Sequence, residues 1–381
     1  MTELRIGICG GGVGGLAAAI GLRKMGHDAI VFEKASQFLR IGADVNLTPN
    51  AVHAIDRLGV GEVLRKTAAR PTFRISRTWD SGEETSRLPM SDAAEKTYGA
   101  PQLTIHRADL LKAMEAEIPA DRVHLGKSVS GIVNDDTRTA ILFEDGSSED
   151  VDVIIGADGI HSAVRNAMFG KDDPKFSGIV SYRSVIPREE AGDIANLDAF
   201  TKWWGPTPEI QIVTFPLTLG KEIFVFATTP QEGWTEEGWT LPGDADELRR
   251  AYEGFHPEAM ALLNACTEVT KSALHIREPM EKWSIANATL LGDAAHPMVP
   301  FMAQGACMAI EDAVVLTRAL DGADLDNVPE RLRIYENVRL ERTASIQRNS
   351  LANEWMKEQG NAEWVYGYHA WETPLDEIGT A

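Results

Sequence analysis

The sequence predicts an α/β protein built around a discontinuous nucleotide-binding domain, with an inserted, mostly antiparallel β-sheet domain and C-terminal helices. Three observations predict this class. A short apolar strand, a glycine-rich turn, a helix and a second strand follow one another at the start of the chain. Residues 178–229 are rich in short strands bounded by glycine and proline. Helical periodicity dominates from Ala309 onward.

The opening predicts a dinucleotide site. Gly10, Gly12 and Gly15 match G-x-G-x-x-G between an apolar strand and the helical pattern 16–22. The first glycine permits the tight turn, the second lets backbone amides approach a pyrophosphate, and the third lets the helix pack on the strand. The helix amino terminus favours the anion. Glu33 ends the second strand, where its carboxylate can accept hydrogen bonds from an adenosine ribose.

The remaining elements follow from periodicity, and the α/β opening and close bracket the β-rich centre. We expect helices or helical stretches at 49–58, 108–116, 246–265 and 309–353, an irregular strand-like region at 71–104, and strands at 122–129, 139–143, 151–155, within 178–229 and at 289–293. The predicted nucleotide-binding domain comprises 1–70, 104–177 and 276–345, the inserted domain comprises 71–103 and 178–275, and 346–381 is a C-terminal helical segment.

Composition narrows the function classes. A chain of 381 residues with 44% hydrophobic and 25% charged residues has room for two domains and resembles an ordinary globular protein. The net charge of -20, with no cluster of lysine and arginine, argues against nucleic acid. No apolar run reaches eighteen residues, so no membrane span is expected. The three cysteines lack metal-ligand spacing, so we expect no metal, reduced thiols and a cytoplasmic location.

Two later stretches complete a recognisable pattern. They are G-A-D-G-I-H-S-A-V-R at 156–165 and L-L-G-D-A-A-H-P-M-V-P-F-M-A-Q-G-A at 290–306. With the glycine turn they make the chain resemble, over nearly its whole length, the FAD-dependent aromatic hydroxylases of the p-hydroxybenzoate hydroxylase superfamily. E-K at 33–34, H-R-A-D-L at 106–110, K-W-W at 202–204 and W-V-Y-G-Y at 364–368 bring it nearest to the salicylate and 6-hydroxynicotinate monooxygenases.

The resemblance implies a set of FAD ligands. Asp293 would accept hydrogen bonds from the ribityl hydroxyls, Arg107 would contact the cofactor, and the segment 300–306 would lie against the isoalloxazine and stabilise negative charge on the reduced ring. Asp158, Ser162 and Arg165 resemble a second fingerprint that serves FAD and nicotinamide together. The predicted cofactor-binding residues are Gly10, Gly12, Val13, Gly14, Gly15, Glu33, Lys34, Arg107, Asp158, Asp293, Gly305 and Ala306.

Candidate residues for the substrate ring lie on the inserted sheet and near the flavin segment. We expect Asn46 to orient a substrate hydroxyl or ring heteroatom, because it stands where the 6-hydroxynicotinate enzymes carry histidine and cannot act as a base. Phe301 replaces a second such histidine. Arg183 is read either as a partner of a substrate carboxylate or as one half of a protein ion pair. The predicted catalytic-site residues are Asn46, Pro300, Phe301, Gln211, Phe215 and Arg183.

The resemblance implies a monooxygenase that uses NADH or NADPH and O2 to hydroxylate a phenolic or hydroxypyridine carboxylic acid, ortho or para to the hydroxyl and in some cases with decarboxylation, through a flavin C4a-hydroperoxide. The enzyme would act as a monomer or homodimer. Two other classes stay open: an NAD(P)-dependent dehydrogenase, which would not need the two later stretches, and a flavin-dependent oxidoreductase or non-enzymatic flavin-binding sensor without aromatic hydroxylation. A flavin-dependent halogenase would need a W-x-W-x-x-I-P motif, which K-W-W-G-P does not supply.

Overall fold

The first sheet is parallel except at one edge. The computed structural model describes residues 3–38, 44–135, 137–234, 236, 238 and 241–375. Within them a six-stranded sheet has the order β18-β19-β11-β1-β2-β7, and only β18 runs antiparallel to its neighbour. Its strands are β1 (Arg5–Cys9), β2 (Asp28–Glu33), β7 (Val123–Leu125), β11 (Val153–Gly156), β18 (Ser284–Ile285) and β19 (Ala288–Leu290).

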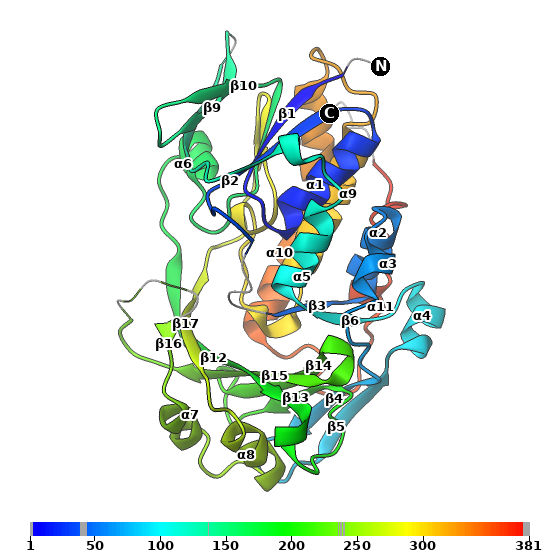
Figure 1. Ribbon diagram of the computed structural model, residues 1–381, viewed down its shortest axis with the longest axis vertical. Helices are drawn as coiled ribbons and strands as arrows, with labels where there is room; N and C mark the ends of the chain where they lie inside the picture. The colour runs from blue at the N-terminus through cyan, green and yellow to red at the C-terminus, as the bar shows by residue number, and fades with distance from the viewer. Residues whose placement is uncertain are drawn as a thin grey trace.

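Helices pack around this sheet and extend toward the rest of the molecule (Figure 1). Glycine allows two of them to approach closely, because a Cβ atom at Gly21 would lie 2.2 Å from the Thr317 hydroxyl oxygen. The helices are α1 (Val13–Lys24), α2 (Pro49–Arg57), α3 (Gly61–Leu64), α5 (Arg107–Glu115), α6 (Ala163–Phe169), α9 (Gly305–Ala319), α10 (Val328–Ala352) and α11 (Glu363–Tyr366). The large apolar core lies between these helices and the sheet.

A second sheet of eight strands has the order β16-β17-β12-β15-β14-β13-β4-β5 and is antiparallel except for the pair β13 and β4. Its strands are β4 (Phe73–Thr78), β5 (Glu84–Pro89), β12 (Lys175–Pro187), β13 (Phe200–Trp204), β14 (Gln211–Leu217), β15 (Glu222–Pro230), β16 (Leu241–Pro242) and β17 (Thr270–Ile276). The antiparallel character expected for the centre of the chain is confirmed.

The two faces of this sheet have different neighbours. Trp203 belongs to the apolar cluster formed with α7 (Ala245–Ala251) and α8 (Pro257–Asn264), which cover one face. Alternation along a strand places Lys202 and Trp204 on the other face. That face is turned toward the six-stranded sheet and its helices (Figure 1). We call it the ring-facing face and define it by Phe200, Lys202, Trp204, Gln211, Phe215, Ser181, Arg183, Phe226 and Ser272.

Two small sheets complete the fold. Strands β8 (Val129–Asn134), β9 (Thr139–Phe143) and β10 (Ser148–Asp150) form a three-stranded sheet. Strands β3 (Asp44–Leu47) and β6 (Leu103–His106) form an antiparallel pair in which Asn46 lies opposite Thr104. The Thr104 hydroxyl donates to the Pro216 carbonyl at 2.6 Å. The pair β3 and β6 therefore rests against β14 of the large sheet.

The structure differs from the sequence expectation in several places. The strand expected at 122–129 is divided between β7 and the first residue of β8, and the strand expected at 289–293 ends at Leu290. The region 71–104 contains helix α4 (Asp92–Tyr98), whose only buried residues are Ala94 and Tyr98, too few to produce a visible period. The stretch 246–265 is two helices, because Gly254 has φ +93° and Pro257 begins the second. The stretch 309–353 is also two helices, separated by residues 320–327. In the described part of the chain, no helix combines the length and apolarity that crossing a membrane requires.

Candidate functional site

The glycine turn between β1 and α1 is tight at two positions and open at the third. Gly10 has φ +112°, and a Cβ atom there would lie 2.3 Å from the Ala157 carbonyl oxygen. A Cβ atom at Gly15 would lie 2.0 Å from the Gly10 carbonyl oxygen. At Gly12 the nearest atom is a guanidinium nitrogen of Arg107, 3.9 Å away. The turn therefore leaves bare backbone beside open space where the motif expects a pyrophosphate.

The flanking residues support the turn in different ways. One carboxylate oxygen of Glu33 accepts from the Gly11 amide at 2.6 Å, and the other accepts from the Ala35 amide at 2.8 Å. Each oxygen keeps a further lone pair for a ribose hydroxyl. Val13 and Gly14 are buried in the first turn of α1, and a Cβ atom at Gly14 would collide with Leu291 at 2.4 Å. Lys34 points into solvent.

Two opposite charges lie beside the turn without a partner among the described residues. Neither the Arg107 guanidinium nor the Asp293 carboxylate makes a hydrogen bond or ion pair with any residue that the structure describes. Burial lowers the pKa of Arg107, and burial raises the pKa of Asp293 against the opposing effects of His296 and Arg107. Asp293 nevertheless stays open to solvent. Charged groups that solvent can reach but that have no partner in the protein are expected to line a cavity for a polar ligand.

The second fingerprint is turned mainly toward its own helix. The Asp158 carboxylate accepts from the Ala163 amide at 2.7 Å and the Val164 amide at 3.2 Å, and the Ser162 hydroxyl also donates to it. Asp158 thus caps α6. The buried Arg165 guanidinium donates to the Ala294 carbonyl oxygen at 3.2 Å, which ties α6 to the segment that carries Asp293.

The segment predicted to face the isoalloxazine is a short 3-10 turn followed by a strained residue. Pro300 is exposed and Phe301 is buried. Ala303 adopts the left-handed conformation with φ 56°, which glycine would adopt without strain. Gly305 and Ala306 begin α9, and a Cβ atom at Gly305 would lie 4.0 Å from an Asp293 carboxylate oxygen. The structure thus brings the start of α9 beside Asp293.

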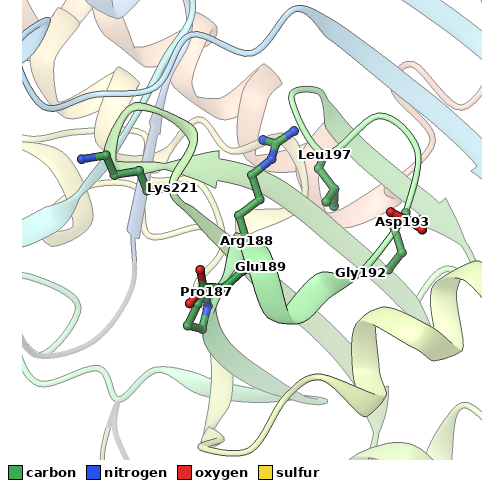
Figure 2. Close-up of a pocket in the computed structure, with 8 residues that line it drawn as sticks. Pro187, Arg188, Glu189, Gly192, Asp193, Leu197 and Lys221 are labelled. Atoms are coloured by element: carbon green, nitrogen blue, oxygen red, sulfur yellow. The ribbon is translucent and has the colours of Figure 1, made fainter.

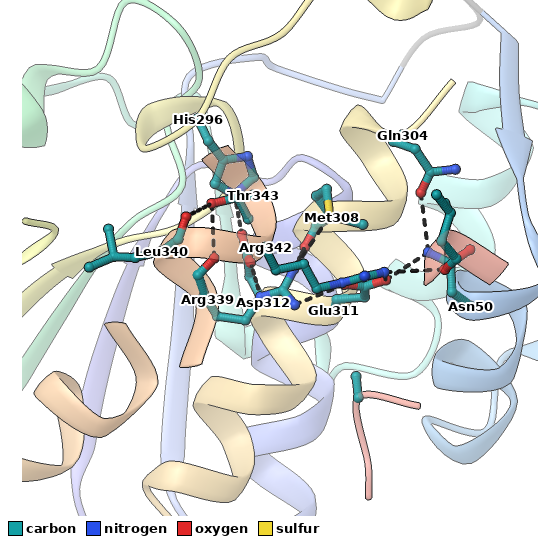
Figure 3. A network of polar contacts seen from close by, with 12 residues as sticks. Asn50, His296, Gln304, Met308, Glu311, Asp312, Arg339, Leu340, Arg342 and Thr343 are labelled. Atoms are coloured by element: carbon teal, nitrogen blue, oxygen red, sulfur yellow. Dashed lines mark hydrogen bonds and ion pairs between the residues drawn. The ribbon is translucent and has the colours of Figure 1, made fainter. Parts of the chain in front are cut away.

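A buried ionic network fixes α9 in place (Figure 3). Arg339 of α10 pairs with Glu311 at 2.8 Å and Asp312 at 2.7 Å, both on α9. Burial alone would raise the pKa of Glu311, but Arg342 and Arg339 outweigh it and lower that pKa. Likewise, His296 and Arg339 lower the pKa of Asp312 against its burial. The guanidinium groups of Arg339 and Arg342 therefore neutralise the buried carboxylates of Glu311 and Asp312.

Hydrogen bonds extend this network from α9 to His296 and to Asn50. Nε2 of His296 bonds the Asp312 carboxylate. On the other side, Asn50 donates to Glu311 at 2.7 Å and to Gln304 at 3.2 Å (Figure 3). His296 is therefore a hydrogen-bonding residue of the scaffold, although its Nδ1 atom is buried without a partner among the described residues.

The predicted ring-contacting residues occupy the ring-facing face and its surroundings. Phe215 stacks with Phe200 at a centroid distance of 5.6 Å in an apolar cluster. Gln211 is fully buried, and its amide nitrogen has no hydrogen-bond partner in the described structure. Arg183 donates to the Ser272 hydroxyl at 2.8 Å. Burial lowers the pKa of Arg183 to about 10, so the guanidinium remains charged at neutral pH.

Asn46 and Phe301 approach this face from the other side. The Asn46 side chain accepts from the Gln102 amide at 2.6 Å, and its backbone carbonyl accepts from the Cys307 thiol at 3.5 Å. Phe301 packs with Ile179 and Leu274, which belong to β12 and β17. The two residues that stand in place of family histidines thus border the ring-facing face through different elements.

Sequence reasoning missed Lys202 and Gln102. Lys202 is fully buried without a described carboxylate partner, and its ammonium donates to Asn353 at 2.5 Å and to the Phe301 carbonyl at 3.4 Å. Burial, with the nearby charges of Arg74 and Lys357, holds its pKa well below the usual lysine value. Gln102 carries no motif signal. The alternation of K-W-W was the one available hint, because it places Lys202 and Trp204 on one face.

A separate surface pocket of about 890 Å³ lies beyond the end of β12. It is lined by Pro187, Arg188, Glu189, Gly192, Asp193, Ile194, Leu197 and Lys221 (Figure 2). Charges of both signs line it, and Arg188 is already paired with Asp198 at 2.6 Å. None of the predicted site residues lines this pocket, and it receives no functional assignment.

Known proteins are similar to this chain in sequence over most of its length. The family described as FAD binding domain matches residues 3–350. The 6-hydroxynicotinate 3-monooxygenase of Bordetella bronchiseptica is 37% identical over 373 residues, which cover 98% of this chain and 97% of the relative. The 3-hydroxybenzoate 6-hydroxylase of Klebsiella oxytoca is 36% identical over 349 residues, which cover 90% and 86%.

Solved structures agree with these relatives. A salicylate hydroxylase substrate complex superposes with a TM-score of 0.83 at 26% identity, over 97% of this chain and 96% of the other. HpxO of Klebsiella pneumoniae, complexed with FAD and uric acid, gives 0.81 at 27% identity, over 94% and 90%. The open glycine turn with Arg107 and Asp293 beside it fits the FAD that this family holds. The chain therefore belongs to the FAD-dependent aromatic hydroxylases.

Proposed function

We propose that this hydroxylase uses NADH or NADPH and O2 to add one hydroxyl group to a phenolic or hydroxypyridine carboxylic acid, releasing water and oxidised nicotinamide. One observation carries the proposal. An open glycine turn lies beside two charges without a partner among the described residues, and the ring-facing face combines aromatic side chains with buried polar groups. When bound, FAD supplies hydride acceptance and oxygen activation.

We propose the following roles on the FAD side. Backbone amides at the start of α1 hold the pyrophosphate, and the Arg107 guanidinium neutralises part of its charge. The Glu33 carboxylate accepts from the ribose, and the Asp293 carboxylate accepts from the ribityl hydroxyls. The amides of Gly305 and Ala306 point out of the first turn of α9, where the positive end of the helix dipole stabilises negative charge.

The substrate side contributes orientation and exclusion of water. Phe215 and Phe301 present apolar surfaces, which keep water from the reacting ring atoms. Asn46 orients the ring through hydrogen bonds and moves no proton, because an amide does not titrate. Arg183 supplies a buried cation for the substrate carboxylate in addition to its bond with Ser272.

We also propose that the two large sheets mark two domains, with the nucleotide-binding domain formed by 1–70, 104–177 and 276–345. The strand assignments support this division, because the six-stranded sheet takes its strands from 5–33, 123–156 and 284–290. The eight-stranded sheet takes its strands from 73–89 and 175–276.

A panel of ring acids tests the proposed function. The FAD-loaded enzyme is given NADH or NADPH with hydroxybenzoates and hydroxynicotinates, and both nicotinamide oxidation and products are followed. We expect at least one acid to accelerate oxidation and to yield a product with one additional oxygen. A protein that retains FAD but oxidises nicotinamide at one unchanged rate with every acid would contradict the proposal and favour the sensor alternative.

A further inference from the structure

Two buried side-chain amides, Asn46 and Gln102, satisfy each other only in part. The amide nitrogen of Gln102 donates to the Asn46 side-chain oxygen at 2.6 Å. The amide nitrogen of Asn46 and the amide oxygen of Gln102 have no partner in the described structure. Asn46 is 6% exposed and Gln102 is 0% exposed, so neither group is satisfied by bulk solvent. Leaving such groups unpaired typically costs about 1–3 kcal/mol each.

The amide pair faces the proposed ring pocket. Asn46 lies opposite Thr104 in the pairing of β3 with β6, so both side chains point to the same side. The Thr104 hydroxyl reaches the Pro216 carbonyl of β14, which fixes that side as the one facing the large sheet. Gln102 precedes Thr104 by two residues and shares its side. The Cys307 thiol meets the Asn46 carbonyl from α9, so the pair lies between the large sheet and the start of α9.

The two groups without a partner are one N–H donor and one carbonyl acceptor, which belong to neighbouring side chains. Turning both amides over would exchange the two roles and leave the same set, one N–H donor and one carbonyl acceptor. A ring edge that carries an acceptor and a donor on neighbouring atoms satisfies both at once. The lactam form of a 2-hydroxypyridine has such an edge, as does a ring with adjacent amino and hydroxyl groups. A lone phenol hydroxyl carries its donor and its acceptor on one oxygen, so it meets both amides only when that oxygen lies between them, whereas an edge with two polar atoms meets each amide separately.

We propose that Asn46 and Gln102 form a specificity-determining pair that selects rings with a donor and an acceptor on adjacent positions over rings with one hydroxyl group. This inference rests on the proposed function and specifies its substrate class. Discrimination follows where the edge of the ring reaches only one of the two amides, because the other buried amide is then left unpaired.

Equilibrium binding tests the proposal without relying on turnover. Calorimetric titration of the FAD-loaded enzyme uses three acids: 6-hydroxynicotinate with its lactam edge, 3-amino-4-hydroxybenzoate with adjacent amine and hydroxyl, and 3-hydroxybenzoate with a lone hydroxyl. We expect one or both of the first two to bind at least about tenfold more tightly than the third, one mispaired buried group corresponding to about that factor. Which of the two binds more tightly distinguishes the lactam from the aminophenol.

Matched variants assign the preference to the pair. Asn46→Leu with Gln102→Met removes both unpaired groups at similar volume and should reduce the preference to less than about threefold. Asn46→Asp keeps the size of the side chain but removes its donor, and should weaken binding of the favoured ring while sparing 3-hydroxybenzoate. The control Thr104→Val alters a fully bonded neighbour on the same side and should leave the ratio unchanged.

The failures are distinguishable. Equal binding of all three acids by an enzyme that hydroxylates one of them would overturn the specificity pair and leave the proposed function standing. A preference that survives in the double variant and in Asn46→Asp would also overturn it. An FAD-loaded protein that binds none of these acids and is stimulated by no member of the wider panel would overturn the specificity pair and the proposed function together.

Discussion

The glycine turn and the ring-facing face solve the same problem of presenting polar groups inside a protein, but over very different sequence distances. In the turn, Gly10, Gly12 and Gly15 lie within six residues, and Glu33 is bonded to the Gly11 amide. On the ring-facing face, Lys202 depends on Phe301 and on Asn353, which lie 99 and 151 positions away in the chain.

The difference teaches how each region tolerates change. The turn works through absent side chains, so added atoms disturb it at once, and its unpaired charges remain solvent-reachable. The ring-facing face works through present side chains held by distant partners, so its polar groups are sealed from water and unusual charge states become possible. We therefore expect substitutions in the turn to remove FAD, and substitutions on the face to leave FAD bound while changing protonation or ring selection.

The largest expected effect is loss of FAD in Gly12→Val. The folded chain has room for the new side chain, because the nearest atom to a Cβ there is 3.9 Å away at the end of Arg107. The side chain would instead fill the space of the pyrophosphate. We expect a folded protein, by circular dichroism and cooperative unfolding, that is purified without flavin absorbance.

A valine at Gly131 provides the control, because no atom lies within 4 Å of a Cβ at that strand position. That variant should keep its flavin. Full FAD occupancy in Gly12→Val would mean that the turn does not hold the pyrophosphate, and the contrast between the two regions would break.

A smaller loss is expected for Asp293→Ala. The proposed bonds to ribityl hydroxyls would be left unmade, at about 1–3 kcal/mol, which corresponds to roughly 5- to 150-fold weaker FAD binding. Fluorescence titration of the apoprotein with FAD measures this. Stability of the apoprotein should not fall, because Asp293 has no described protein partner to lose. Unchanged FAD affinity together with reduced apoprotein stability would reverse the assigned role.

The pH dependence of the stability of Lys202→Met tests the ring-facing face. Burial lowers the pKa of Lys202 in the folded protein, whereas the unfolded chain titrates near about 10.4. Between those values the unfolded state binds a proton that the folded state lacks, so the free energy of unfolding of the wild type rises with pH across that window. Below the folded pKa this slope vanishes.

In Lys202→Met the contribution of this lysine to the slope should be missing at every pH, while FAD stays bound. Urea unfolding of both proteins at a series of pH values isolates the lysine as a difference curve, and the lost bonds to Asn353 and Phe301 appear only as a constant offset. Parallel curves across the alkaline range would show that Lys202 carries an ordinary charge.

The smallest effect concerns backbone strain next to the flavin segment. Ala303 has φ 56°, a conformation that costs a residue with a side chain about 1–2 kcal/mol. Ala303→Gly relieves this strain but gains about 0.4–1 kcal/mol of unfolded-state entropy. We expect a net stabilisation of about 1 kcal/mol or less, seen as a higher urea midpoint at unchanged slope. A lower midpoint would show that the alanine methyl group contributes packing that outweighs the strain.

The sequence predicts the first region far better than the second, for physical reasons. The strand, turn and acid of the opening obey short-range steric rules, so Gly10 and Gly15 could be assigned from spacing alone. Resemblance was needed for Arg107 and Asp293, which join the turn only through the fold. Helix α4 was missed because seven residues with two buried side chains carry almost no period.

The ring-facing face could be predicted only in outline. Alternation along β13 separates Trp203 from Trp204, because strand neighbours point to opposite faces. Gln102 was not predictable, since its partner Asn46 lies 56 positions earlier and the pairing of β3 with β6 has no sequence signature. Asp158 shows the limit of a motif: its carboxylate caps α6, a local role that the fingerprint does not reveal.

Isotope transfer tests the central claim most directly. The FAD-loaded enzyme, with the best acid of the panel and its preferred nicotinamide, is supplied with ¹⁸O2, and product, nicotinamide and peroxide are quantified together. The account predicts one ¹⁸O atom in the new hydroxyl group and one nicotinamide oxidised per hydroxylated molecule, with little peroxide. Recovery of every acid unchanged, with all the reductant appearing as labelled hydrogen peroxide, would contradict it.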